Sequence, residues 1–468
     1  MRLYTSFLTA LVVSNSLPAQ SLAITGVTIV DPSVAASKQA GMTNQTVVIR
    51  NGVIEGVGPA NTVPIPRGAK RVDGRGKFLI PGLWDSHVHF MNTGASALPL
   101  DVALGVTSVR EMGGYIDSTR AWQSRMRAGT LVGPRILTAG PILEAPSYLD
   151  NVRKRSARDP RIGQRVLPYR IAVGNAADAR RAIDSLVKLH VDFVKIRTTE
   201  SPESFFAILR EARRAGLKVA GHAPSVASIT VAVDSGQRDV EHVIAPPLSR
   251  LPADARDSVY LDFAKWGTWY TPTLVVTQAV GLSGDSAKLA IFSDAARRTD
   301  ERQPYASAWL LGWWSMQAEE RASDTSSTRA AEMRELYESS VADVRRMHEL
   351  GVLILAGTDA GSVLVYPGFA LHDELRLLVE DAGFTPLEAL WSATVGPTRF
   401  AGLQETLGSI APGKIADLVL LDANPLDNIR NTRRISAVIQ GGRLFTRKDL
   451  DVLLASARRG GSATASHY

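Results

Sequence analysis

Short apolar segments alternate with amphipathic segments through the middle of the chain. Eight segments are apolar and rich in β-branched residues, and they lie at residues 78–90, 106–112, 134–139, 191–196, 217–222, 239–243, 268–276 and 351–359. Between several of them the apolar positions recur with a helical period, at residues 177–189, 202–215, 228–235, 371–381 and 386–394. Alternating strands and helices predict a parallel sheet, and eight such units predict an α/β fold that closes into a (β/α)8 TIM barrel.

A second pattern of short β-branched runs lies near the two ends of the chain. These runs occupy residues 22–31, 45–58, 415–422 and 435–445. The Asn51-Gly52 pair inside the second run is typical of a tight hairpin turn. We therefore expect a small β-sandwich domain built from both ends of the chain, residues 21–78 and 405–448, beside a barrel at residues 79–404.

The segment at residues 278–349 is too long for an ordinary loop. Its last part predicts an amphipathic helix, because seven apolar residues fall on one helical stripe: Met333, Leu336, Tyr337, Val341, Val344, Met347 and Leu350. A second apolar group, rich in tryptophan, lies at residues 309–316. We expect these helices to pack against the barrel. The alternative is that the segment forms a lid or an apolar wall for the substrate.

The first 20 residues have the pattern of a signal peptide. Arg2 precedes a short apolar run at residues 7–13, and residues 16–19 offer a cleavage region. The run is too short to span a membrane, so we expect an exported protein, periplasmic or secreted. An ordinary buried N-terminal segment is the alternative. At the other end, residues 449–468 are expected to form a tail that is disordered from Arg458 onward.

Composition narrows the classes of ligand and partner. The chain has no cysteine, so disulfides are excluded and a metal must be held by histidine, carboxylate or a modified side chain. The formal charge is +7, but arginine is spread along the chain, which favours a solvated basic surface over nucleic-acid binding. No later stretch is long and apolar enough to span a membrane. We expect a small-molecule substrate, and the sequence leaves open whether the protein is a homo-oligomer.

Four of the eight histidines lie at the ends of predicted barrel strands. His87 and His89 are one residue apart, so a strand points both imidazoles to the same face, where they can bind one metal ion. Two histidines do not complete such a site. Catalytic groups of a (β/α)8 barrel come from the carboxyl ends of its strands, and four further candidates end strands here: Lys195, His222, His242 and Asp359.

Lys195 is an unusual neighbour for a metal ion, because its ammonium group would repel the cation. One interpretation is a lysine paired with a nearby carboxylate. The other is an amine that has captured CO2, since a metal-rich and desolvated site lowers the lysine pKa and makes the amine nucleophilic. The resulting carbamate has two oxygens and can bridge two cations, an arrangement known in hydrolytic sites.

These motifs resemble those of the amidohydrolase superfamily. The resemblance rests on Pro-Gly-x-x-Asp-x-His-x-His at residues 81–89, the strand-end lysine, the two later histidines and Gly-Thr-Asp at residues 357–359. It extends to the segments at residues 385–390 and 408–419. The chain is most similar to the imidazolonepropionase-like and prolidase-like (Xaa-Pro dipeptidase-related) branch, which includes exported bacterial enzymes that cut peptide or amide bonds.

The resemblance implies a ligand set for two metal ions. His87, His89 and Asp359 would bind the first, His222 and His242 the second, and carboxylated Lys195 would bridge them. Zinc is the usual ion of the family, and nitrogen with carboxylate ligation suits it. One departure is the segment at residues 141–150, which has no histidine where relatives often have a Gly/His-rich loop.

The expected activity is metal-assisted hydrolysis of an amide bond. Asp359 would act as general base, and Arg197, two residues beyond Lys195, would hold a substrate carboxylate unless it pairs with an acidic loop residue. Dipeptides and N-acyl amino acids are the candidate substrates. The alternatives are a mononuclear deaminase or cyclic amidine (imidazolone) hydrolase, and a metal-binding protein without catalysis, against which the intact ligand set argues.

Overall fold

The computed structural model describes residues 21–39, 42–242, 248, 251–281, 285–294, 296–322 and 329–462. Residues 1–20, for which we expect a signal peptide, lie outside this part of the chain. No helix within the described part has the length and apolar character needed to cross a bilayer.

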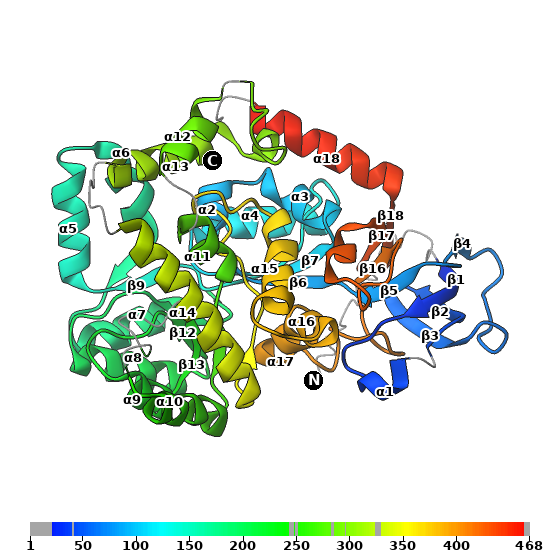
Figure 1. The fold of residues 1–468 in the computed structure, drawn as a ribbon, viewed down its shortest axis with the longest axis horizontal. Helices are drawn as coiled ribbons and strands as arrows, with labels where there is room; N and C mark the ends of the chain where they lie inside the picture. The colour runs from blue at the N-terminus through cyan, green and yellow to red at the C-terminus, as the bar shows by residue number, and fades with distance from the viewer. Residues whose placement is uncertain are drawn as a thin grey trace, which may run out of the picture.

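The middle of the chain forms two parallel sheets (Figure 1). The three-stranded sheet has the order β6 (Leu83–Val88), β7 (Val106–Glu111), β8 (Arg135–Thr138). The seven-stranded sheet has the order β10 (Arg170–Ala172), β9 (Ile142–Glu144), β11 (Val194–Ile196), β12 (Val219–Gly221), β13 (Gln237–Glu241), β14 (Trp269–Thr271), β15 (Leu353–Ile354). Every strand pair in both sheets is parallel, as the alternation of strands and helices predicts.

Backbone hydrogen bonds connect the two sheets at two places. On one side Ser86 N donates to Ala356 O over 2.9 Å and Asp359 N donates to His87 O over 2.7 Å, which joins β6 to the segment that follows β15. On the other side Asp192 N donates to Thr138 O over 2.9 Å, which joins β8 to the segment before β11. The carboxyl ends of the strands therefore lie together.

The five helices predicted between and after the strands are confirmed within two residues. They are α7 (Ala176–Lys188), α8 (Pro202–Arg214), α9 (Ile229–Ser235), α15 (Phe369–Glu380) and α16 (Pro386–Ser392). Their ends follow from local chemistry: Ser201 and Thr385 each close a capping box in front of a proline at the first helical turn. The other helices are α1 (Ala36–Gln39), α2 (Phe90–Thr93), α3 (Ala97–Ala103), α4 (Ile116–Arg127), α5 (Pro146–Ser156), α6 (Pro160–Val166), α10 (Ala253–Trp266) and α17 (Val395–Ala401).

The segment between β14 and β15 is helical. It contains α11 (Leu274–Gly281), α12 (Asp285–Ser293), α13 (Ala308–Ala322) and α14 (Arg329–Glu349). The amphipathic helix predicted from the apolar stripe is confirmed as part of α14, whose Tyr337, Val344 and Met347 are buried. In the view of Figure 1, α11 and α14 pass in front of the parallel strands.

The predicted strand at residues 268–276 is wrong in its second half. β14 ends at Thr271, and Leu274 already belongs to α11. The buried Glu374 carboxylate accepts hydrogen bonds from Leu274 N and Val275 N, at 3.0 and 2.8 Å, and so satisfies the first amides of this helix. This cap comes from a residue 100 positions away, so the β-branched pattern could not reveal it.

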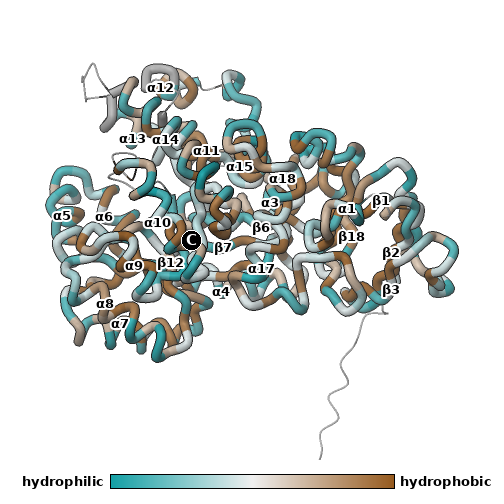
Figure 2. The backbone as a smooth tube through the Cα atoms, turned by 60° about the horizontal axis from the view of Figure 1, so that its bottom comes forward, coloured by the Kyte–Doolittle hydropathy of each residue, from teal (hydrophilic) through white to brown (hydrophobic). Residues whose placement is uncertain are grey.

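Both ends of the chain contribute to one eight-stranded sheet. Its order is β18 (Arg443–Thr446), β17 (Ile435–Gln440), β16 (Leu418–Leu421), β5 (Phe78–Pro81), β1 (Leu22–Ile29), β2 (Gln45–Arg50), β3 (Val53–Pro59), with β4 (Lys70–Asp73) beside β1. The antiparallel β16–β5 pair joins the ends. In Figure 1 the blue and orange strands lie side by side, and Figure 2 shows hydrophobic stretches of chain gathered there.

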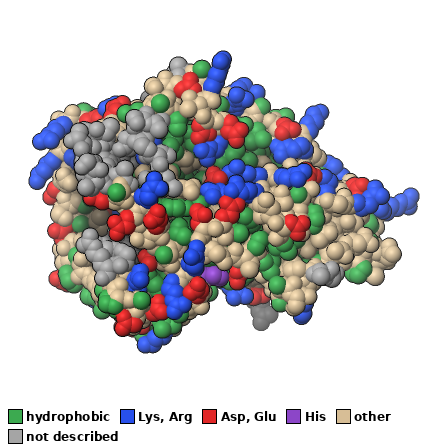
Figure 3. All heavy atoms as spheres, in the orientation of Figure 1, with side chains coloured by type: hydrophobic (Ala, Val, Ile, Leu, Met, Phe, Trp, Pro, Cys, Tyr) green, Lys and Arg blue, Asp and Glu red, His purple; other side chains and the backbone are tan. Residues whose placement is uncertain are grey.

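The C-terminal tail differs from expectation. Residues Arg447–Ser462 form a helix, α18, although we expected disorder from Arg458 onward. Leu450 and Ala457 of α18 are buried, so this helix has an apolar side that packs on the protein and stabilises it. Figure 3 shows that basic and acidic side chains are mixed over the face drawn there.

Candidate metal centre

β6 carries the two histidines that are one residue apart. All six residues of the strand are buried, and His87 has no exposed surface. The Nε2 atoms of His87 and His89 lie 3.4 Å apart, so the two imidazoles face the same point, as the spacing predicts.

Asp359 reaches these imidazoles from the segment after β15. Its Oδ1 lies 3.2 Å from His89 Nε2 and 3.5 Å from His87 Nε2. Gly357 permits this approach, because a Cβ there would lie only 2.9 Å from His87 Cβ. The ligand atoms of His87, His89 and Asp359 lie within 4.8 Å of one another, so this group could hold a metal ion.

His222 and His242 follow β12 and β13 directly. Their ring centroids are 5.1 Å apart, and the His242 ring lies 4.4 Å from that of His87. Gly221 precedes His222 where a Cβ would meet Ile196 O at 1.9 Å. His242 and Asp359 both have left-handed backbone, with φ of 63° and 54°. Such conformations are unfavourable for these residues and occur where the surrounding structure fixes them, often at functional sites.

Lys195 lies on β11, between these two groups in sequence. Its side chain is 1% exposed, and Nζ has no hydrogen-bond partner within the described residues. The structure therefore does not form the ion pair between Lys195 and a carboxylate that was the first of our two interpretations. Burial lowers the pKa of Lys195 to about 8, against the opposite influence of Glu241 and Asp359. An orphaned, desolvated amine is the state that reacts with CO2, so Lys195 fits the bridging position.

Burial also keeps the imidazoles neutral. It lowers the pKa of His87 and of His222 well below the ordinary value, and that of His242 to about 4. A neutral imidazole has the free lone pair that a metal ligand needs. The donor set, neutral nitrogen with carboxylate, therefore fits zinc.

A network of buried charged side chains contacts His87 at its Nδ1 atom. The sequence interpretation missed this network. Glu241 Oε2 lies 2.5 Å from His87 Nδ1, and Arg110 binds Glu241 Oε1 at 2.8 Å and Asp239 Oδ2 at 2.5 Å. Burial raises the pKa of Glu241, but Arg110, His87 and Lys195 outweigh it and hold this pKa well below the usual range. The signal was present as Asp-x-Glu-His at residues 239–242, with two acids inside an apolar strand.

Asp85 braces the same region. It accepts hydrogen bonds from Thr358 Oγ1 at 2.6 Å and from Thr358 N at 3.0 Å, which fixes the residue before Asp359. Burial raises the pKa of Asp85 to about 7, against these hydrogen bonds. The Pro-Gly-x-x-Asp motif thus positions Asp359 as well as the two histidines.

The centre opens into a cavity of about 420 Å³. Five of the six predicted ligands line it, namely His89, Lys195, His222, His242 and Asp359, while His87 lies behind His89. Arg197 lines the cavity on the same side as Lys195, as strand parity predicts. A second arginine, Arg170, lies beside it and was missed.

The two arginines share one buried carboxylate. Arg197 lies 3.2 Å from Glu144 Oε1, and Arg170 contacts the same oxygen. Arg197 therefore has an acidic partner, as in the alternative that we kept, but this partner ends strand β9 and does not belong to a loop. The Arg197 guanidinium also lies over the Tyr148 ring, 4.5 Å from its centroid. Two cations and one anion leave a net positive charge on this wall of the cavity.

The helices between β14 and β15 also border the cavity. Apolar side chains from α11, α13 and α14 line it, namely Val276, Val280, Trp313, Met333 and Leu336. The packing expected for residues 278–349 is confirmed, because Tyr337, Val344 and Met347 share a core with Tyr270 and Ile354 of the parallel strands.

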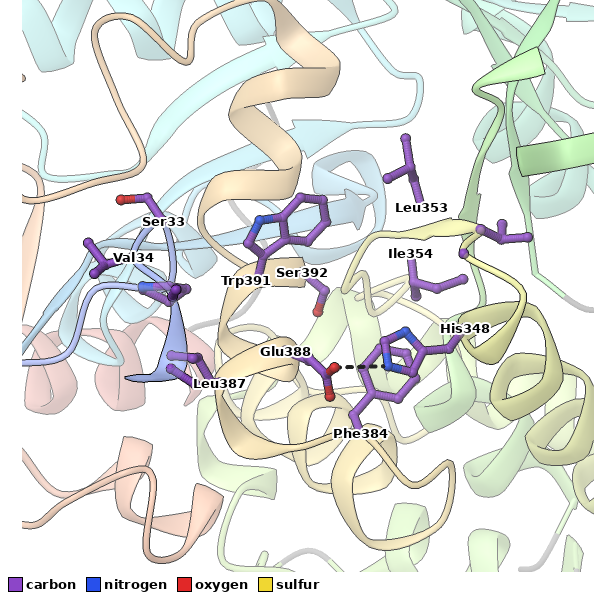
Figure 4. Close-up of a pocket in the computed structure, with 15 residues that line it drawn as sticks. Ser33, Val34, His348, Leu353, Ile354, Phe384, Leu387, Glu388, Trp391 and Ser392 are labelled. Atoms are coloured by element: carbon purple, nitrogen blue, oxygen red, sulfur yellow. Dashed lines mark ion pairs between the residues drawn. The ribbon is translucent and has the colours of Figure 1, made fainter. Parts of the chain in front are cut away.

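A second cavity of about 560 Å³ lies beside β15, and none of the six candidate ligands lines it (Figure 4). His348 stacks on Phe384 with ring centroids 3.8 Å apart and pairs with Glu388 at 3.5 Å. Within the described residues, only the group at His87, His89 and Asp359 has metal-binding spacing. We therefore place the candidate active site in the first cavity.

Comparison with known proteins gives one family match, which covers most of the chain. The profile of the amidohydrolase family matches residues 78–445. The ochratoxinase of Aspergillus niger is 25% identical over 417 residues, which are 78% of this chain and 75% of that protein.

The imidazolonepropionase of Cutibacterium acnes is 25% identical over 405 residues, 84% of this chain and 87% of that protein. A solved Xaa-Pro dipeptidase with bound methionine superposes with a TM-score of 0.68, covering 91% of this chain and all of that one at 20% identity. This last likeness concerns the fold alone.

Proposed function

The chain belongs to the amidohydrolase family and is a hydrolase of carbon–nitrogen bonds, and we propose that it cleaves the amide bond of dipeptides or N-acyl amino acids with two zinc ions. We place it in the imidazolonepropionase- and prolidase-like branch, for which the sequence motifs and the imidazolonepropionase relative are the support. The observation that carries the proposal is the convergence of five predicted ligands on one cavity, with the sixth directly behind them.

In this proposal the two parallel sheets are one closed (β/α)8 barrel, and the sheet of the chain ends belongs to a small β-sandwich domain. The backbone hydrogen bonds that join β6 to the segment after β15, and β8 to the segment before β11, support closure. So does the position of every candidate ligand at or beyond the carboxyl end of its strand, where barrel enzymes have their catalytic groups.

The six side chains divide between two ions. His87, His89 and Asp359 would hold one, His222 and His242 would hold the other, and Lys195 as a carbamate would supply an oxygen to each. To form it, the Lys195 amine adds to CO2 and loses one proton. When bound, the two ions lower the pKa of a water molecule toward neutrality and polarise the scissile carbonyl.

Asp359 moves the proton in this scheme. Its carboxylate accepts a proton from the attacking water and later donates it to the leaving amine. Ser362 Oγ donates to Asp359 Oδ2 over 2.6 Å, so the carboxylate keeps its orientation during the transfer. Arg197, with Arg170 beside it, binds the substrate carboxylate from the positive wall.

The experiment is a hydrolysis assay on the full chain prepared with zinc and bicarbonate. The panel contains a chromogenic ester, dipeptides and N-acyl amino acids, each with and without chelator. We expect amide cleavage that the chelator abolishes and zinc restores. Full amide hydrolysis in the presence of the chelator would contradict the proposal. Cleavage of the ester without cleavage of any amide would also contradict it.

We also propose that the protein is exported, to the periplasm or the medium. The support is the charged start, short apolar run and small-residue region within residues 1–20. N-terminal sequencing of the protein from a fractionated bacterial host should find a chain that begins near residue 20. An uncleaved cytoplasmic product would refute export.

A further inference from the structure

We propose that the cavity selects amides whose acyl side is apolar and uncharged, that is, N-acyl amino acids rather than dipeptides. The inference rests on the proposed function and decides between the two substrate classes that it leaves open. A dipeptide and an N-acyl amino acid present the same carboxylate and the same amide. They differ in the α-ammonium group beside the scissile carbonyl.

The described lining of the cavity offers no free counter-ion to an ammonium group. Arg170 and Arg197 line it, and the buried Glu144 that they share neutralises one of their two charges. The substrate carboxylate, which both substrate classes carry, compensates the other charge. Among the described residues of the lining, Asp359 is the single carboxylate, and the metal site uses it. The ammonium group of a dipeptide would therefore be buried there without a partner of opposite charge, which disfavours its binding.

The apolar part of the cavity lining, which we call the apolar wall, suits an apolar acyl group. It is built from Val276 and Val280 of α11, Trp313 of α13, and Met333 and Leu336 of α14. Burying an apolar chain against such residues is favourable in proportion to the area removed from water. The polar groups nearby, Thr277 and Gln317, are neutral, so they offer hydrogen bonds to an ammonium group but no compensating charge.

This wall is fixed to the metal centre. Trp314, next to Trp313, is fully buried and donates from Nε1 to Gly361 O over 3.0 Å, two residues from Asp359. Trp309 Nε1 donates to Met91 O over 3.3 Å at the start of the same helix. The apolar surface thus keeps one position relative to the ligands, so it can discriminate between acyl groups by fit.

The test compares two substrates that differ by the amino group alone. They are Leu-Phe and N-(4-methylpentanoyl)-Phe, offered to the full chain prepared with zinc and bicarbonate. We expect kcat/KM to be higher for the acylated compound by about 100-fold. Equal values, or a preference for Leu-Phe, would overturn the inference and leave the proposed function standing. Hydrolysis of neither compound, nor of any other amide, would instead defeat the proposed function.

A variant tests the cause of the preference. Gln317→Glu adds one carboxylate to the wall at almost constant volume, and it should reduce the ratio of the two kcat/KM values by about 10-fold. Gln404→Glu, on an exposed residue outside the cavity, is the matched control and should leave the ratio unchanged. An unchanged ratio in Gln317→Glu would contradict the charge argument.

Binding without turnover gives a second readout. Calorimetric titration of both compounds into the Asp359→Asn variant should show tighter binding of the acylated compound, and Gln317→Glu in that background should narrow the difference. Tighter binding of Leu-Phe would overturn the inference even if the turnover rates agreed with it.

Discussion

At the scale of single residues, the site depends on groups that act through the ligands. Glu241 and Arg110 fix His87 from its Nδ1 side, and Asp85 fixes the backbone before Asp359. Buried partners of this kind orient metal-bound imidazoles and raise their basicity. The left-handed backbone of His242 and Asp359 shows that the positions of these ligands are imposed by the surrounding chain.

Replacing the acid behind His87 should weaken metal binding. Glu241→Gln removes the charge next to His87 Nδ1 and leaves Arg110 with Asp239 alone. We expect zinc affinity to fall about 10- to 100-fold, measured by competition with a chromogenic chelator. Glu203→Gln, on the exposed side of α8, should bind zinc like the parent. Unchanged zinc affinity in Glu241→Gln would show that the Glu241 carboxylate does not contribute to metal binding by His87.

The proposed base can be tested by its closest substitute. Asparagine tolerates the left-handed conformation of residue 359, so Asp359→Asn should fold normally. Because the amide cannot accept the proton, kcat should fall by at least about 100-fold, measured under saturating substrate, while zinc still binds. Full activity would exclude Asp359 as the base.

At the scale of elements, α13 connects the helical segment between β14 and β15 to the metal centre. Trp314 is fully buried, its ring lies 5.0 Å from Tyr366, and its indole donates to Gly361 O. Arg165 lies over the Trp309 ring, 3.3 Å from its centroid, and ties α13 to α6. The helix therefore joins the cavity wall to the loop that carries Asp359.

Removing the hydrogen bond between Trp314 and Gly361 should lower both the stability of the protein and its activity. Trp314→Phe leaves Gly361 O without its donor, and we expect a loss of about 2 kcal/mol in unfolding free energy, measured by urea denaturation. It should also lower kcat/KM, because Gly361 lies two residues from Asp359.

Trp309→Phe serves as the comparison. It removes the hydrogen bond to Met91 O, which lies two residues from His89, so it should lower both stability and kcat/KM as Trp314→Phe does. Unchanged kcat/KM in both variants would argue against a link between α13 and the metal centre.

How much the sequence predicts differs from element to element. Helices α7, α8 and α16 were predicted because their periodicity and caps are local. β9 and β10 were missed because each has three residues and their pairing partners are distant in sequence. The candidate ligands could be selected from the sequence since each lies at or near the end of an apolar strand, whereas Glu144, Arg170 and Glu241 gain their contacts from distant strands.

At the scale of the whole molecule, strands from the two chain ends pair with each other, and the C-terminal part also contacts the helices around the parallel sheets. β16 pairs with β5, and Leu418 and Leu420 share a core with Ile24 and Ile49. His372 of α15 makes a further connection, with Nε2 2.9 Å from Leu104 O and Nδ1 3.0 Å from Thr432 Oγ1. Unfolding should therefore involve the chain ends and the parallel sheets together.

This buried histidine predicts how global stability depends on pH. Burial, with help from Arg433, lowers the pKa of His372 to about 4. The unfolded chain binds a proton near pH 6.5 and the folded chain does not, so stability present above that pH is lost as the pH falls toward 4. The loss from this residue is about 3 kcal/mol.

The measurement is urea denaturation between pH 7 and pH 4, for the parent and for His372→Gln. The variant should be less stable at pH 7 but should lose less stability on acidification. The two pH slopes are compared, because the substitution also changes hydrogen bonds. Identical slopes would contradict a neutral, buried His372.

The most direct test of the two-metal centre is the number of zinc ions per chain, measured by mass spectrometry of the metal in protein prepared with zinc and bicarbonate. We predict two ions per chain in the parent and at most one in Lys195→Ala, since that variant cannot form the bridging carbamate. One ion in the parent, or two in the variant, would contradict the account.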